Sequence, residues 1–482
     1  MFRDGKVRLS RHSLSTFFGA PALMDAIKLA TLRHKVFRFR AQFAQSGGEE
    51  FAAALSPRFI EQTLLALHPD GWRERLYGPL TTLKLFVGQV LSADHACMDA
   101  VGRRLSERLS VGQSICSLNT GPYCKARQRL PAELPRTLAE ELAQGLESAV
   151  PRGWRWRGRA VKLFDATTVS MPDTPSNQAA YPQSLEQKPG LGFPVARIGA
   201  LISLATGAVI GHEVAACQGK GTGESTLFRG LYGHLVPGDI VLADALHCTW
   251  WTIAALHRAG ADLVMPLNGN RTADFSMGRS LGAHDHVVSW PRLQRPKWMS
   301  VDVYQELPDA LTLREVQIGQ WTLVTTLTNA RAIRPQHLHA LYAMRWNIEV
   351  DFRTLKTMLA MDILRCKSKD MIDKEIAVYI LANNLVRWAM AQAAHLSDVL
   401  PRALSFMAAK RALSLLEQHQ RHHPNRRHDN TMQAILRLIA RSGLPYRPGR
   451  IEPRAKKRRP KPLPLLTVPR VLAREAILRQ RA

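Results

Sequence analysis

The segment Leu341–Leu359, LYAMRWNIEVDFRTLKTML, constrains the fold of this chain more than any other stretch. At about 100° per residue, its apolar side chains fall within one arc of roughly 80°, the width of a buried helix face. They are Leu341, Met344, Ile348, Phe352, Leu355 and Leu359. An adjacent arc of roughly 60° holds Tyr342, Arg345, Glu349 and Lys356. The pattern predicts a docked helix with a carboxylate between two cations along one edge, although a solvated, salt-bridged face would look the same.

Charge indicates the class of partner. The 482 residues include 66 Lys and Arg against 39 Asp and Glu, a net charge of +27. Such a basic chain is expected to act on a polyanion, with DNA or RNA as the first candidate. No long basic amphipathic helix dominates and no run of about 18 apolar residues occurs, so no membrane partner is expected. The six cysteines form no CxxC pair, which favours reduced thiols. We expect a cytoplasmic, nucleoid-associated protein.

Residues 1–150 predict a helical DNA-binding domain. A basic start, residues 1–45, is either a nucleic-acid arm or a helix with a solvated face. Helices are expected from Ser56-Pro57 and over 79–90, 94–108 and 132–148. Between the last two, GPYCKARQRLP brings Lys125, Arg127 and Arg129 to a turn and helix start, where phosphates bind readily. An ordinary helical domain with a basic surface is the alternative.

Strand patterns begin at Trp154. RAVKLFDATTVSM alternates, and a hairpin is expected around Thr206-Gly207. A buried strand ending at Asp244, a helix near 249–259 and the strand ADLVMPL follow. Residues 269–334 then predict a β meander. We expect an α/β fold whose mixed sheet, over 151–268 and 335–398, is interrupted by an inserted β domain at 269–334.

The end of the chain predicts helices and a tail. EIAVYILANNLVRWAMAQAA and LPRALSFMAAKRALSLLEQ have helical patterns. Helices in 399–445 are candidates for contact between two copies of the chain. Residues 446–482 are basic and Pro-rich, which is typical of a mobile tail.

Three acids from distant segments are candidates for chemistry. Asp165 follows the apolar VKLF, Asp244 follows DIVLA, and Glu349 lies on the helix edge. Each strand-end acid alone is as readily a cap. Brought together, three carboxylates would repel one another unless a divalent cation lay among them. Two Mg²⁺ ions about 3.5–4 Å apart can activate an attacking oxygen and stabilise a leaving one. On so basic a protein, the expected substrate is a phosphodiester, with Tyr342, Arg345 and Lys356 holding phosphates.

These residues resemble a known family. Tyr342-(2)-Arg345-(3)-Glu349-(6)-Lys356 is similar to the YREK signature of bacterial insertion-sequence transposases of the DDE class, the insertion-sequence-four family. DATT at Asp165 and VLAD at Asp244 resemble its other two acidic motifs. The resemblance covers about 160–395. It implies an RNase H-like core, preceded by a helical domain and followed by C-terminal helices. It also implies that Asp165, Asp244 and Glu349 hold two ions of Mg²⁺ or Mn²⁺. It also implies an insert before the glutamate, for which 349 − 244 = 105 residues leave room.

The resemblance further implies roles in DNA handling. Trp321 occupies the place of a tryptophan that stacks on a base flipped out of the transposon end; Trp298 and Trp290 are rivals, and a core position for Trp321 is the alternative. Where many relatives have a basic residue after the second acid, this chain has Ala245-Leu246. The implied activity is metal-dependent cleavage of double-stranded DNA at the element's ends and strand transfer into a target, by a homodimer. The rivals are a nuclease of the same fold without strand transfer, and an inactive DNA-binding regulator.

Overall fold

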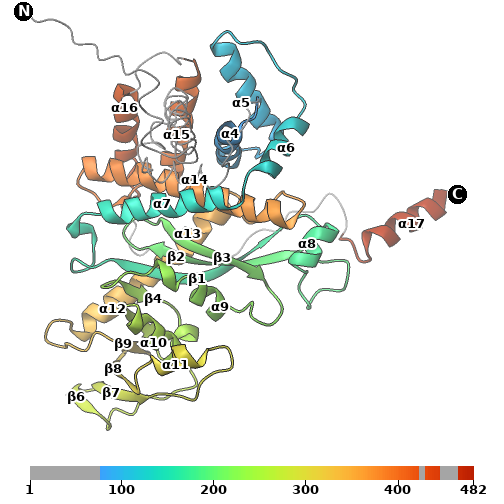
Figure 1. Cartoon of the computed structure of the whole chain (residues 1–482). Helices are drawn as coiled ribbons and strands as arrows, with labels where there is room; N and C mark the ends of the chain where they lie inside the picture. The colour runs from blue at the N-terminus through green and yellow to red at the C-terminus, as the bar shows by residue number, and fades with distance from the viewer. Residues whose placement is uncertain (1–75, 423–428, 446–464, 482) are drawn as a thin grey trace, which may run out of the picture.

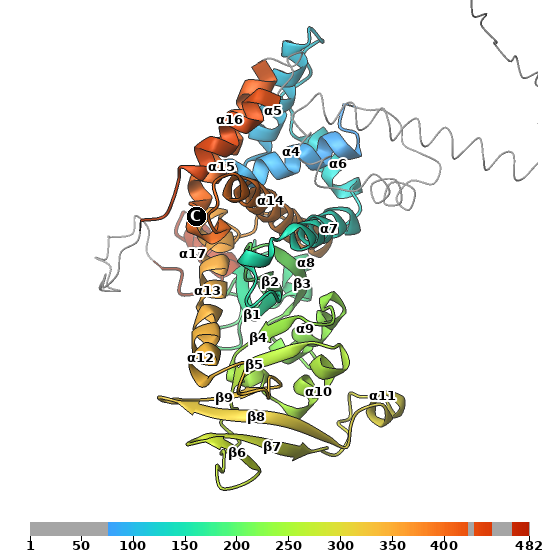
Figure 2. The ribbon, with the colours of Figure 1, turned by 90° about the vertical axis from the view of Figure 1, so that its left-hand side faces the viewer.

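A computed structural model describes residues 76–422, 429–445 and 465–481 (Figures 1 and 2). The basic start and the helix expected at Ser56-Pro57 lie outside these residues. Among the described residues no helix has the length and apolar character needed to cross a membrane.

Five strands form the part of the sheet that carries the candidate acids. They are β1 (Val161–Ser170), β2 (Val195–Ser203), β3 (Val209–Ala216), β4 (Ile240–Leu242) and β5 (Asp262–Pro266). Their order is β3-β2-β1-β4-β5. β2 pairs antiparallel with both β1 and β3, whereas β4 runs parallel to both β1 and β5. The β2–β3 hairpin turns at Gly207, whose φ of 77° suits glycine, as its sequence predicts. This mixed sheet is consistent with an RNase H-like core.

The predicted meander consists of β6 (Arg279–Gly282), β7 (Asp285–Pro291), β8 (Ala310–Ile318) and β9 (Trp321–Thr325). It differs from the expectation in one respect: β9 pairs with β5, so the four strands extend the core sheet to nine strands. Fully buried Arg314 in β8 makes two bonds, of 2.8 and 2.6 Å, to the carboxylate of Asp285 in β7. This ion pair links the outer strands.

Helices cover both faces of the sheet. α7 (Glu133–Ala149) packs against β3 and against α14 (Lys369–Leu396), a helix of 28 residues that is buried along most of its length. Buried Asn384 fastens this layer, because it bonds to both backbone groups of Val209 and to the carbonyl of Ala139, each at 2.9 Å. α9 (Glu224–Gly230), α10 (Trp250–Arg258) and α11 (Val301–Gln305) lie on one side of the sheet. α12 (Pro335–Ala343) and α13 (Asn347–Arg353) lie on the other side (Figure 2).

The first described helices are α4 (Pro79–Leu91), α5 (Cys97–Ser110) and α6 (Gly121–Arg129). α4 and α5 lie close to the predicted ranges 79–90 and 94–108, whereas α6 covers the segment predicted as a turn and helix start. They surround a small core of their own, formed by Tyr77, Leu85, Ala100, Val101, Leu105, Tyr123 and Ala126.

The 341–359 stretch is helical but not one regular helix. It comprises the end of α12 (Pro335–Ala343), the 3₁₀ turn η5 (Met344–Trp346), α13 (Asn347–Arg353) and the π-helical turn η6 (Thr354–Met358). The predicted apolar face is buried except at Met344, which is 41% exposed. That expectation was wrong because the tighter 3₁₀ turn rotates Met344 away from the buried face.

The C-terminal part contains α15 (Phe406–His422), α16 (Asp429–Ala440) and α17 (Arg470–Arg481). The expected mobile tail therefore includes a helix, and 446–464 lie outside the described residues.

Candidate active site

Arg345 joins two of the three candidate acids. Its Nη1 lies 3.3 Å from Oδ2 of Asp165 in β1, and its Nη2 lies 3.5 Å from Oε1 of Glu349 in α13. Residues 180 and 184 positions apart in sequence are thus brought together, since 345 − 165 = 180 and 349 − 165 = 184. The strand, the helix and the cation between them form one side of the site.

Asp244 approaches from the neighbouring strand. It follows β4, which pairs in parallel with β1, so both strands carry their acids toward the same edge. Its Oδ1 accepts a 3.1 Å bond from the N–H of Leu246, which fixes the turn after the strand. The buried imidazole of His247 lies behind it, with Nε2 3.5 Å from the same Oδ1.

Neighbouring groups shift the pKa of Asp165 in opposite directions. Burial raises the pKa of Asp165 above its ordinary value, and the negative charges of Asp244 and Glu224 raise it further. The Ala166 N–H, 2.8 Å from Oδ1, and the Arg345 guanidinium oppose this rise in the pKa of Asp165. Asp165 therefore lies in a field in which an added cation would be stabilised.

The three acids supply the donor atoms that a divalent cation needs, but among the described residues they are not gathered around one point. Asp165, Asp244 and Glu349 supply only carboxylate oxygens, the ligands that Mg²⁺ prefers, and their side chains are 24, 42 and 40% exposed. The arrangement has a guanidinium between two of them, and in the described part of the chain no three His, Cys, Asp or Glu side chains gather as a metal-holding group. Arg345 thus supplies the positive charge that keeps Asp165 and Glu349 together.

The other signature residues face the same region. Lys356, in the π-helical turn, donates from Nζ to Thr167 Oγ1 of β1 at 3.3 Å. Burial raises the pKa of Tyr342, so its phenol stays protonated near neutral pH. The ring of Trp321, at the start of β9, lies 6.1 Å from that of Tyr342 and is 42% exposed. The sheet extension therefore places an accessible aromatic face beside α12, the helix that precedes the one carrying Glu349.

The two rival tryptophans lie in other surroundings. Trp290 is buried, and its Nε1 bonds to Glu315 at 2.8 Å, which is a core position. Trp298 is 51% exposed and contacts Arg229 and Trp251, on the α9–α10 side of the sheet.

The basic cluster of α6 is divided. Lys125 and Arg129 are exposed, whereas the guanidinium of Arg127 turns inward over the rings of Phe86 and Tyr123, at 4.7 and 5.2 Å. Phosphate binding by these three residues stays a prediction, and the inward position of the Arg127 guanidinium follows from a helical spacing that puts it above buried rings. Sequence spacing could not reveal which cation covers that core.

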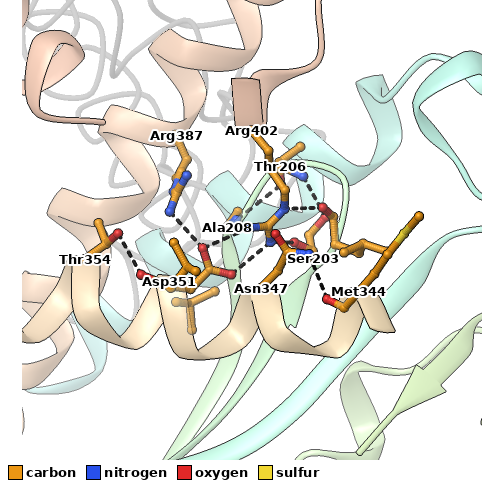
Figure 3. A network of polar contacts seen from close by, with 12 residues as sticks. Ser203, Thr206, Ala208, Met344, Asn347, Asp351, Thr354, Arg387 and Arg402 are labelled. Atoms are coloured by element: carbon orange, nitrogen blue, oxygen red, sulfur yellow. Dashed lines mark hydrogen bonds and ion pairs between the residues drawn. The ribbon is translucent and has the colours of Figure 1, made fainter. Parts of the chain in front are cut away.

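A buried carboxylate two residues after Glu349 anchors α13 (Figure 3). Asp351 accepts a 2.8 Å bond from Arg387 of α14 and bonds of 3.1 and 2.8 Å from Arg402. Arg402 also donates to the carbonyls of Ser203 and Leu204 at the end of β2. The helix that carries Glu349 is thereby tied to both the sheet and α14. The sequence held a signal, since Asp351 interrupts the edge of the apolar arc.

Three further polar residues near the acids escaped sequence reasoning. Thr167 receives Lys356, Glu224 contributes charge to Asp165, and His247 lies against Asp244. Only Thr167, in the DATT motif, carried a signal.

Comparison with known proteins finds similarity to transposases. Residues 156–385 match the family model described as the transposase DDE domain, a range that includes all three acids. Over 360 residues, 70% of this chain and 76% of the relative, the sequence is 29% identical to the transposase InsG for insertion sequence element IS4 of Escherichia coli (strain K12). A solved piggyBac transposase synaptic complex with hairpin DNA aligns over 82% of this chain and 84% of that chain, with 12% identity and a TM-score of 0.39. From the domain match and the IS4 relative, the chain functions as a DDE transposase.

Proposed function

We propose that Asp165, Asp244 and Glu349 are the catalytic acids with which this transposase cuts the ends of its own element and joins them to target DNA. The observation that carries the proposal is the Arg345 bridge between Asp165 and Glu349, with Asp244 close enough to raise the pKa of Asp165. Hydrolysis at an end would free a 3′-OH, and this hydroxyl would then attack the target phosphodiester.

The three acids would hold Mg²⁺ or Mn²⁺, two ions, whose chemistry is to activate the attacking oxygen and stabilise the leaving one. The remaining residues act on the DNA. In the YREK arrangement Arg345 and Lys356 would pair with phosphate oxygens, and the protonated phenol of Tyr342 would donate to another. Trp321 would stack on an extruded base beside Tyr342.

Double-stranded DNA is the proposed partner because a net charge of +27 favours binding along phosphates. We assign end binding to the helical region within residues 1–150, where Lys125 and Arg129 are exposed. Action on two ends requires two active sites, so we propose a homodimer in the DNA complex, with the 399–445 helices as its contact. Acting on the ends of an element within chromosomal DNA would place the protein in the cytoplasm with the nucleoid.

The test is substitution of each acid without change of shape. Asp165→Asn, Asp244→Asn and Glu349→Gln should each abolish cleavage of a duplex carrying the element's end in Mg²⁺, while end binding in a gel-shift assay stays within a few-fold of the unaltered protein. Asp309→Asn is the matched control, because this acid is 92% exposed and pairs only at the outer strands. Near-normal cleavage by any of the three variants would refute the assignment. Adding target DNA separates a transposase, which forms joined products, from a nuclease, which does not.

A further inference from the structure

A cavity of about 680 Å³ lies between α9, α10 and the segment that leads into α11. We call it the α10 groove. Its walls carry three aromatic rings, Tyr232, Trp251 and Trp298, and two cations, Arg229 and Arg258. Its volume is that of a small-ligand site, and the groove cannot admit a duplex.

Trp298 forms an exposed platform in this groove. The Arg229 guanidinium lies 4.3 Å from the centre of its ring, and the Trp251 ring stands nearly perpendicular to it at 82°. Arg229 donates to Thr226 Oγ1 at 2.8 Å and lies over this ring, and it forms no ion pair with a carboxylate of the described residues, so its charge is available to the groove. A half-exposed tryptophan beside a cation is costly for packing but suited to stacking a flat, anionic ligand.

Two residues of the groove wall lie close in sequence to residues of the candidate site. Ser225, in its wall, follows Glu224, whose charge acts on Asp165. Thr249, the cap of α10, lies five residues after Asp244 and is also in the wall. The groove extends along α10, which lies on the opposite side of the sheet from α12, the helix that carries Tyr342 (Figure 2).

We propose that the α10 groove binds one or two unpaired nucleotides of a DNA strand, with a base stacked at Trp298 and a phosphate at Arg229. This rests on the proposed function, since a DNA end bound at the acids is what would supply the unpaired nucleotides. Arg258 is partly neutralised by Glu306 at 2.7 Å, so Arg229 supplies most of the attraction.

Binding is tested in EDTA, where no cleavage occurs, with the full chain and a fluorescent dT4 oligonucleotide followed by anisotropy. Trp298→Ala should weaken dT4 binding about 10-fold or more, as expected for loss of one stacked base, whereas Trp298→Phe should retain most of it. Arg229→Gln should also weaken it and lower the salt dependence. Binding of duplex element ends should be unchanged in all three variants.

A second measurement locates the contact. Photocrosslinking of dT4 containing 5-iododeoxyuridine should place the modified peptide at Trp298 or Trp251. Equal dT4 affinity of Trp298→Ala and the unaltered protein, or a crosslink elsewhere, would overturn the proposal. Asp165→Asn should bind dT4 normally, so failure of the groove and failure of the catalytic acids are distinguishable.

Discussion

Replacing Asp351 with Asn should destabilise the fold strongly. The substitution keeps the shape of the side chain but removes the charge that pairs with two arginines at 2.8 Å. Arg387 is 4% exposed, and burial lowers its pKa to about 10 even with Asp351 beside it. Loss of one partner of a buried pair costs about 3–5 kcal/mol. Because the Arg402 side chain keeps 16% exposure, we expect the lower part of this range.

The assay is urea unfolding followed by tryptophan fluorescence. Asp309→Asn, which breaks an exposed pair with Arg292, should cost less than about 1 kcal/mol and serves as control. The triple variant Asp351→Leu, Arg387→Met, Arg402→Met should recover much of the lost free energy, since apolar side chains need no counter-charge. A loss below about 1 kcal/mol for Asp351→Asn, or no recovery in the triple variant, would show that these charges are not desolvated as described.

Two further outcomes are expected. Trp321→Ala should leave first-strand nicking intact and slow second-strand cleavage roughly 10- to 100-fold, since about 1.4 kcal/mol corresponds to each tenfold in rate; equal loss of both steps, resolved on denaturing gels over time, would make Trp321 a packing residue. Burial lowers the pKa of His212 to about 3. Its contribution to stability is therefore fully present above the unfolded pKa near 6.5 and is lost as the pH falls below that value, because only the unfolded chain then takes up a proton. From pH 7.5 to 5 this should remove about 2 kcal/mol of unfolding free energy, a pH dependence that His212→Leu should abolish in urea titrations.

Local patterns predicted the parts of the fold that depend on local chemistry. Alternating β-branched residues and strand-end polar residues located β1 and β4, and with them Asp165 and Asp244. Helical spacing placed Arg345 and Glu349 together because residues four apart share a face whether the turn is α or nearly so. The same reasoning failed at Met344, where the turn tightens, and at Arg127, where an aromatic core attracts a cation.

The pairing of strands that are far apart in the chain cannot be predicted from local sequence patterns. Nothing in β5 or β9 alone specifies that Val264 lies opposite Thr325, so the meander was expected as a separate domain. The α10 groove was missed for a related reason. Trp251 and Trp298 are 47 residues apart, since 298 − 251 = 47, and only the packing of α10 near the segment before α11 brings their rings within 6.5 Å.

The pairing of β5 with β9 fixes the distance between Trp321 and Asp244. Met265 and Val324 face each other across the pair, and β5 is hydrogen-bonded to β4, the strand that leads to Asp244. In the proposed roles, Trp321 stacks on the base and Asp244 is a catalytic acid. β9, which begins at Trp321, and β4, which leads to Asp244, are both hydrogen-bonded to β5, so no flexible loop separates these strands within the sheet. The span from the cut phosphate to the extruded base would then be set by strand spacing rather than by loop motion. If one nucleotide were inserted in that span of the element's end, the DNA would have to deform, because the paired strands cannot change their spacing.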